Sequence, residues 1–191
     1  MKMILALVAT LLFSSQLLAA GQTSALDEQA PGYYRMKLGK LRVTAVSDGT
    51  VTVPLNKLLT NISPEKLRQS MANEAMTPQA ETSINAYVID DGKKRVLVDT
   101  GAGELFGSRG GHLLENLAAA GYPPESINDV LLTHIHADHS GGVSRAGKLA
   151  FPEANVYVDK RDVDFWLNPS NVTQVEPGEA HTFAESEKTL R

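Results

Sequence analysis

Three histidines and one aspartate lie within residues 134–139, inside the segment THIHADHSGG of residues 133–142. These side chains are His134, His136, Asp138 and His139. Imidazole and carboxylate groups are ligands of zinc in proteins, and manganese, iron and cobalt accept similar sets. The sequence has no cysteine, so thiolate sites and disulfides are excluded. Any metal must therefore be bound by histidine and carboxylate groups.

The spacing of the cluster favours an extended backbone over a helix. On a helix, residues two positions apart point about 200° apart, so His134 and His136 could not share an ion. On an extended segment the same two side chains point to one side. The segment 129–132, apolar from Val130 onward, predicts a buried strand that leads directly into the cluster. Asp138 and His139 follow after a turn of the chain, so we expect them to face a second ion nearby.

A run of solvent-exposed histidines, or a loop whose polar groups cap the backbone, is the alternative interpretation. It explains poorly why a buried strand ends in four metal-binding side chains followed by Gly141 and Gly142. His181 is different, because a lone histidine in a helical pattern is usually a surface or core residue.

Strands and helices are predicted to alternate around the cluster, which is typical of an α/β layered fold. A helix should begin at Ser63-Pro64-Glu65, where serine is a good cap and proline suits the first turn. Strands are predicted over 84–89, 95–98, 129–132 and 155–158, and further helices over 112–120 and 160–167.

The N-terminal part of the chain is predicted to hold a hairpin. Asp48-Gly49 separates two alternating runs, 41–46 and 50–53, and this dipeptide favours a tight turn. Turn chemistry is then a sufficient role for Asp48. Residues 22–40 are polar and mixed, so we expect a leader or arm there and regular structure from about residue 41.

The histidine motif and four other stretches resemble the metallo-β-lactamase superfamily. The pattern Thr-His-x-His-x-Asp-His-x-Gly-Gly is specific for the superfamily. The other stretches are similar to its methyl parathion hydrolase and quorum-quenching lactonase branch, and they comprise residues 43–49, 81–87, 97–101 and 164–167.

The resemblance implies an αββα sandwich with two divalent metal ions at one edge. His134 and His136 would bind the first ion, and Asp138 and His139 the second, with Asp138 also the candidate catalytic residue. Zinc is the expected metal, and manganese, iron and cobalt are alternatives. Asp99 would orient a ligand histidine, or cap local backbone amides as a turn residue, and the two roles can coexist.

The resemblance also bears on the extent of the domain. Family members complete the metal site with a later histidine, a bridging aspartate and a final histidine, and no matching context follows His139. A helix is predicted from about Glu176 without a stop signal before Arg191. We therefore expect residues 41–191 to be the N-terminal half of the domain, incomplete at the C-terminus and inactive alone.

Three aromatic residues, Phe106, Trp166 and Phe183, match stretches that line the substrate pocket in the resembling branch. Without the resemblance, core packing is the commoner role of such residues. Both roles stay open at this point.

Composition and the N-terminus narrow the choice of partner and location. The 191 residues are 42% hydrophobic and carry a net charge of −4 without a basic patch, which disfavours nucleic acid. Residues 1–21 join a basic start at Lys2 to an apolar run and the small residues 19–21, as in a cleaved signal peptide. The apolar run is too short for a stable membrane anchor. We expect a periplasmic or secreted protein, with a homodimer left open.

These features predict a hydrolase in which a metal-activated water attacks a small-molecule lactone, ester or organophosphate. A β-lactam-hydrolysing relative is one alternative. The other is a non-catalytic truncated fragment that retains half a metal site.

Overall fold

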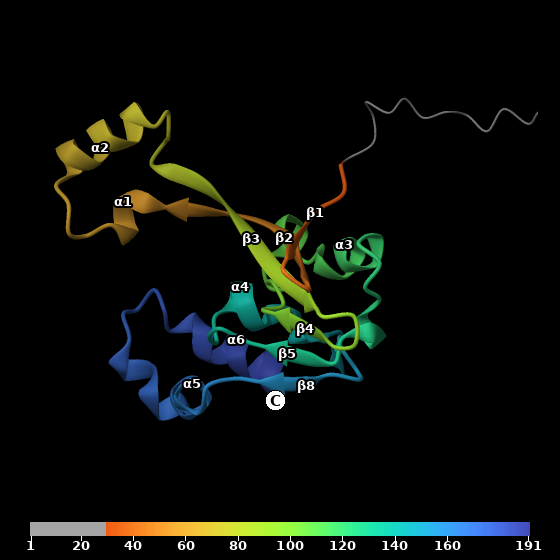
Figure 1. The fold of residues 1–191 in the computed structure, drawn as a ribbon. Helices are drawn as coiled ribbons and strands as arrows, with labels where there is room; N and C mark the ends of the chain where they lie inside the picture. Colours follow the sequence, from red (N-terminus) through yellow and green to blue (C-terminus); the bar gives the residue numbers. More distant parts are fainter. Residues whose placement is uncertain (1–29) are drawn as a thin grey trace, which may run out of the picture. The chain divides into compact units, whose positions relative to one another are not determined.

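A computed structural model describes residues 30–191, and the predicted signal peptide lies outside the described residues. The chain divides into the units Met1–Ala30 and Pro31–Arg191, and the fold is that of the second unit. This unit is built on a six-stranded mixed sheet with the strand order β1-β2-β3-β4-β5-β8 (Figure 1). Within residues 30–191, no helix is long and apolar enough to cross a membrane.

The sheet changes from antiparallel to parallel at β4. Strands β1 to β4 pair antiparallel, and β5 and β8 then add parallel to β4. The strands are β1 Tyr33–Leu38, β2 Leu41–Pro54, β3 Gln79–Asp90, β4 Arg95–Val98, β5 Asp129–Leu131 and β8 Asn155–Tyr157, with a separate ribbon of β6 Ser144–Arg145 and β7 Lys148–Leu149.

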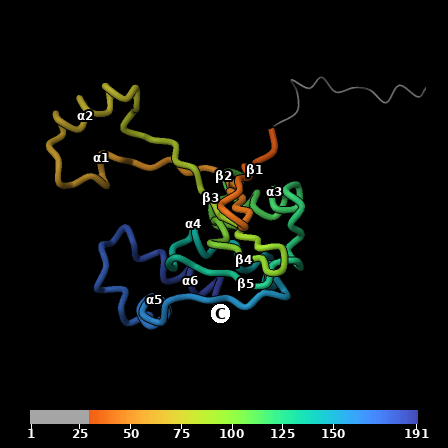
Figure 2. Tube along the Cα trace, viewed as in Figure 1, coloured from red at the N-terminus to blue at the C-terminus, as the bar shows by residue number. Residues whose placement is uncertain are grey.

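The helices connect these strands. β2 and β3 stay paired as far as Pro54 and Gln79, and α1 and α2 join their ends (Figure 2). The α-helices are α1 Leu55–Leu58, α2 Pro64–Asn73, α3 Leu113–Ala119, α4 Ala137–Ser140, α5 Lys160–Trp166 and α6 His181–Leu190. Short 3-10 helices comprise Gly107–Arg109, Pro124–Ser126, Gly141–Val143 and Pro169–Gln174.

The hydrophobic core lies on one face of the sheet. Thr44, Val88, Leu97 and Val130 occupy one register row across β2, β3, β4 and β5, and all are fully buried. α3 contributes Leu113 and Leu117 to the same core. The neighbouring row points to the opposite face and contains large exposed side chains, namely Tyr34, Tyr87, Leu131 and Tyr157. The described residues thus form one helical layer and one large sheet, in agreement with the predicted α/β class.

Two predictions for the N-terminal part are wrong. Regular structure is already present at Tyr33, because β1 pairs with β2 inside the stretch assigned to a leader over 22–40. Asp48-Gly49 forms no hairpin. β2 continues through it and pairs with β3 on both sides of a bulge between Ser47 and Gly49. A bulge accommodates an extra residue within one strand, so the two alternating runs belong to a single strand.

The other predicted elements are confirmed within a few residues. Ser63 caps α2 by accepting a hydrogen bond from the Lys66 amide at 3.3 Å. Gly121 follows α3 with φ +84°, the left-handed conformation that suits glycine after a helix. The strand predicted over 129–132 is β5, and it leads directly into the histidine segment.

Candidate metal centre

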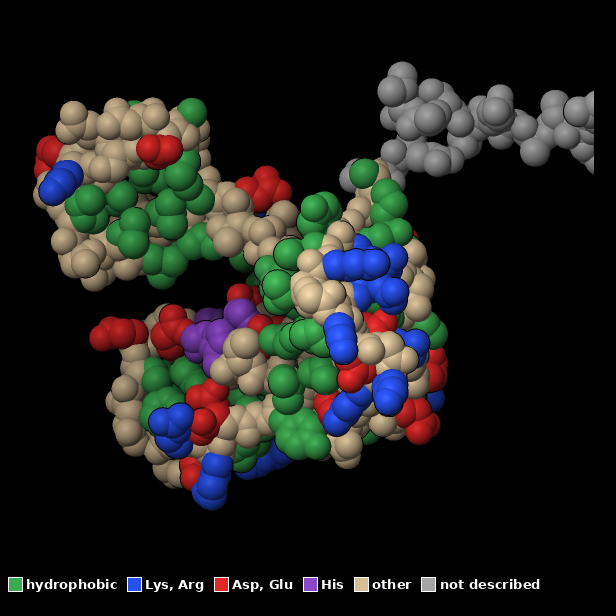
Figure 3. All heavy atoms as spheres, viewed as in Figure 1, with side chains coloured by type: hydrophobic (Ala, Val, Ile, Leu, Met, Phe, Trp, Pro, Cys, Tyr) green, Lys and Arg blue, Asp and Glu red, His purple; other side chains and the backbone are tan. Residues whose placement is uncertain are grey.

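The histidine segment bends over residues 133–136 and then forms a single helical turn. After β5 the chain is extended at His136, with φ −118° and ψ 159°, and α4 then begins at Ala137. The ring centroids of His134 and His136 are 4.7 Å apart, and those of His134 and His139 are 4.0 Å apart. Histidine side chains form a single purple patch beside acidic groups on the surface in Figure 3. The fold therefore gathers the three imidazoles that the motif places close in sequence.

Two carboxylates contact His139 on opposite sides of its ring. Asp99 Oδ2 lies 2.8 Å from Nδ1, and Asp138 Oδ2 lies 3.2 Å from Nε2. Hydrogen bonding to Asp138, and then to Asp99, raises the pKa of His139 to about 9, although burial opposes the shift. The ring is therefore held in place by charge-assisted contacts.

Asp99 contacts a histidine of the cluster, as the orienting role requires, whereas the amide that it caps belongs to Thr133, 34 residues away, and not to its own turn. Besides its contact with His139, its Oδ1 accepts hydrogen bonds from the Thr133 amide at 2.8 Å and hydroxyl at 3.0 Å. The same hydroxyl lies 3.1 Å from His134 Nδ1. Burial raises the pKa of Asp99, but the hydrogen bonds from His139 and Thr133 outweigh it and the pKa is lowered. One buried carboxylate thus connects two histidines of the cluster.

The protonation of His134 suits a metal ligand. Burial, followed by the nearby charges of His139 and His136, lowers the pKa of His134 below its ordinary value. Its neutral form is therefore favoured, and neutral imidazole is the form that binds metals.

The donor types fit a divalent metal ion, but their present arrangement is not a complete coordination shell. In residues 30–191, no group of three or more His, Asp or Glu side chains is arranged to hold an ion. His139 Nε2 contacts Asp138, which places a carboxylate where a metal would have to bind. The residues that would hold a metal are His134, His136, Asp138 and His139, once His139 and Asp138 separate.

The predicted pocket aromatics lie at different depths beside the cluster. The Trp166 ring centroid is 5.3 Å from that of His136, and Phe183 packs behind Trp166 at 5.0 Å with 8% of its surface exposed. Phe106 lines a cleft of about 340 Å³ together with His136 and Asp138. The structure therefore places Phe106 and Trp166 beside the histidines, whereas Phe183 supports Trp166 from the core.

His181 lies closer to the cluster than its isolated position in the sequence indicated. It lines the same cleft as His136 and Asp138, and its Nε2 is 3.7 Å from Glu185 Oε2. Its partner is thus a glutamate one turn further along α6.

Sequence reasoning missed Asp162, which supports the histidine segment from α5. Its Oδ2 accepts a hydrogen bond from the Ile135 amide at 3.0 Å, between His134 and His136 in the sequence. This amide has no hydrogen-bond partner in the sheet. The Asp162 carboxylate therefore holds the backbone in place between the two histidines. No local signal marks Asp162, because its role depends on a contact 27 residues away.

The Gly141-Gly142 pair has a steric role behind the histidines. A Cβ atom at Gly141 would lie 2.3 Å from the Ala102 carbonyl oxygen, and one at Gly142 would lie 2.0 Å from that of Thr100. Only glycine permits such close contact between the two loops. Thr100 completes the contact by donating its amide and hydroxyl to the His139 carbonyl, at 2.7 and 2.9 Å.

Comparison with known proteins gives the family. The metallo-beta-lactamase superfamily matches residues 80–180 of this chain. The chain is similar to the crystal structure of hydrolase AbOPH in the beta lactamase superfamily, at 34% identity and a TM-score of 0.78, over 85% of this chain and 58% of that one. It is also similar to AidC, a dizinc quorum-quenching lactonase in complex with a product, at 27% identity and a TM-score of 0.69, over 84% and 60%.

One relative in sequence is named for a different activity. The atrochrysone carboxyl ACP thioesterase of Passalora fulva is 38% identical over 80 residues, which are 42% of this chain and 22% of that protein. The chain thus spans about three fifths of the similar solved structures and a smaller share of this relative. On the family match and these folds, the protein belongs to the metallo-beta-lactamase superfamily.

Replacing Asp99 by asparagine should weaken Zn²⁺ binding about 10- to 100-fold, because the carboxylate that holds His139 loses its charge. Asparagine tolerates the φ of +60° at this position, so the backbone should be retained. In the metal-free protein the pKa of His139 should also fall from about 9, measured by NMR titration of the imidazole. An unchanged His139 pKa in the variant would contradict the role of Asp99.

Proposed function

We propose that the protein is a metal-dependent hydrolase whose reaction takes place at the histidine cluster. The observation that carries the proposal is the set of three imidazoles with ring centroids 4.0 and 4.7 Å apart, one of them anchored by the buried Asp99. Clusters of imidazole and carboxylate ligands suit zinc, and the similarity to a dizinc lactonase supports two zinc ions.

A divalent ion at these residues would lower the pKa of a bound water and polarise a substrate carbonyl or phosphoryl oxygen. The protein supplies the positioning. Asp99 and Asp162 fix the side chain of His139 and the backbone at Ile135. Asp138 is a half-buried carboxylate. Burial raises its pKa, but hydrogen bonding to His139 outweighs burial, and the pKa is lowered below its ordinary value. It therefore remains ionised near neutral pH, ready to bind a cation or to accept a proton.

The substrate we propose is a small lactone or ester, with organophosphate triesters as a related class. The cleft beside His136 and Asp138 joins an apolar wall, formed by Phe106 and the end of β2, to acidic side chains. An apolar wall binds an uncharged substrate, while the acidic groups Glu179 and Glu185 disfavour an anionic one. Acyl thioesters are a second candidate, because a thioesterase is among the relatives.

We also propose that the protein is exported, on the signal-like pattern of residues 1–21, and that its substrates are encountered in the periplasm or outside the cell. No nucleic-acid partner is proposed, in keeping with the net charge of −4.

The test is a hydrolysis assay of the protein produced from its complete reading frame, with metal content measured by elemental analysis. The panel comprises an N-acyl homoserine lactone, a p-nitrophenyl ester, an organophosphate triester, an acyl thioester and a β-lactam. We expect turnover of a lactone or ester that a chelator abolishes and Zn²⁺ restores. Turnover of the β-lactam alone would favour the alternative class, and a zinc-loaded protein inactive on the whole panel would refute the proposal.

A further inference from the structure

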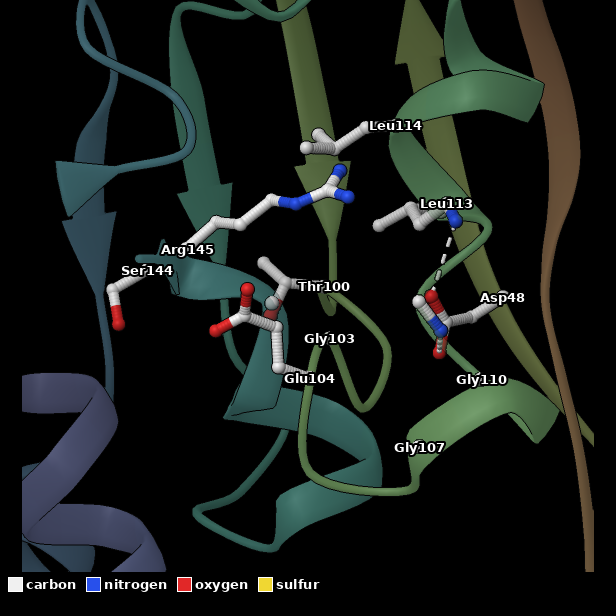
Figure 4. A pocket seen from close by; sticks show the side chains of 12 residues that line it. Asp48, Thr100, Gly103, Glu104, Gly107, Gly110, Leu113, Leu114, Ser144 and Arg145 are labelled. Carbon is white, nitrogen blue, oxygen red and sulfur yellow. Dashed lines mark hydrogen bonds between the residues drawn. The ribbon is translucent and has the colours of Figure 1, made fainter. Parts of the chain in front are cut away.

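A second cavity, separate from the histidine cleft, lies between the loop after β4 and the start of β6 (Figure 4). Its volume is about 140 Å³, enough for a molecule of several non-hydrogen atoms. Its walls carry charged, hydroxyl and apolar side chains, namely Thr100, Glu104, Leu113, Leu114, Ser144 and Arg145. None of the candidate metal ligands contributes to this lining.

Two opposite charges face this cavity without neutralising each other. In Figure 4 the Arg145 side chain reaches across the cavity toward Leu114, and the Glu104 carboxylate points in beside it. Among residues 30–191, the Arg145 side chain has no hydrogen bond or salt bridge, and the contact of Glu104 with the Ala146 amide is long, at 3.4 Å. Both groups therefore have unused capacity to bind a ligand.

The third charged group of the cavity is already satisfied. The Asp48 carboxylate accepts hydrogen bonds from the amides of Ala102, Gly111 and Leu113, at 2.8, 3.1 and 3.1 Å. It thus has little capacity left for a ligand cation. The charge pattern available to a ligand is one guanidinium and one carboxylate, with apolar contacts at Leu113 and Leu114.

We propose that this cavity binds a small zwitterion, an α-amino acid with a short apolar side chain. Its carboxylate would pair with Arg145, whose guanidinium can bind it through two parallel hydrogen bonds. Its ammonium group would pair with Glu104, and its side chain would lie against Leu113 and Leu114. A simple anion would leave Glu104 without a partner, and a simple cation would leave Arg145 without one.

Occupancy of the cavity would affect the loop that supports the histidines. Thr100 lines the cavity and also donates two hydrogen bonds to the His139 carbonyl. Asp99, its neighbour in sequence, contacts the His139 ring. A ligand that immobilises Thr100 would therefore favour one position of His139, and metal binding would in turn favour the ligand by the same factor.

The experiment titrates the full chain with L-valine, followed by calorimetry and by the amide NMR signals of Thr100 and Gly103. We expect saturable binding with a dissociation constant on the order of 1 mM, as befits a ligand of this size. Isovalerate, which lacks the ammonium group, and isobutylamine, which lacks the carboxylate, should each bind at least about tenfold more weakly, since each loses one charge-assisted pair.

Two variants locate the site. Arg145→Gln should weaken both L-valine and isovalerate about tenfold, whereas Glu104→Gln should weaken L-valine and leave isovalerate unchanged or tighter. Both side chains are exposed, so thermal unfolding should be unaltered, and Arg161→Gln on α5 is the matched control. Absence of saturable L-valine binding, or binding that neither variant alters, would overturn the proposal. Because none of these titrations needs catalysis or metal, their outcome is independent of the proposed hydrolase activity.

Discussion

Replacing Asp48 by alanine should lower the free energy of unfolding by about 4 kcal/mol, an effect at the upper end for a single substitution. Asp48 is fully buried in β2, and its two carboxylate oxygens accept three backbone hydrogen bonds from the loop that leads into α3. Removing the acceptor leaves those amides without partners in a buried place, and each such loss costs about 1 to 3 kcal/mol. The loop from Ala102 to Leu113 would then lose its attachment to the sheet.

Urea denaturation followed by circular dichroism measures this effect. Asp91→Ala is the matched control, because the Asp91 carboxylate also accepts two backbone hydrogen bonds, from Lys93 and Lys94, but at the surface. Water can replace that acceptor, so the control should lose less than about 1 kcal/mol. If the two substitutions lowered the free energy of unfolding equally, burial of the hydrogen bonds to Asp48 would add no stability beyond that of exposed ones.

Asp48 also shows where local sequence patterns fail. The Asp-Gly pair between alternating runs is a turn signal, but the register with β3 keeps the strand intact and requires only a bulge between Ser47 and Gly49. What decides the outcome is the pairing of residues 41–54 with residues 79–90, which no window of neighbouring residues contains. β1 also depends on pairing with a distant segment. Its sequence is polar and mixed, and it becomes a strand because it pairs with the edge of β2.

Elements with strong local signals were predicted well. β4 and β5 are short, mostly apolar strands whose Leu97 and Val130 are fully buried, and α2 carries a serine cap followed by proline. The histidine cluster also has a local signal, because the alternation of His134 and His136 after a strand is visible within a few residues. Its role in metal binding could therefore be predicted before any contact was known, and it stays a prediction.

Asp99 and Asp162 hold the histidine segment in place through long-range contacts, and only Asp99 could be predicted. Asp99 was recognisable from its place after a buried strand, but its bond to His139 spans 40 residues. Asp162, 27 residues from its partner Ile135, has a sequence context that describes only the start of a helix. Spatial partners of this kind become visible only when the sheet brings β4, β5 and the following helix together.

Replacing His136 by alanine should weaken Zn²⁺ binding by about 100-fold or more. Zinc binding to four-ligand protein sites amounts to about 10 to 16 kcal/mol, so one ligand accounts for roughly 3 kcal/mol, or two powers of ten. Competition with a chromophoric chelator measures the affinity. His112→Ala is the control, since that exposed histidine pairs with Glu115 away from the cluster and should leave affinity unchanged. His181→Ala tests the other histidine of the cleft. Should His181→Ala cause the large loss and His136→Ala none, the metal would lie at α6 and the assignment of the histidine motif would be wrong.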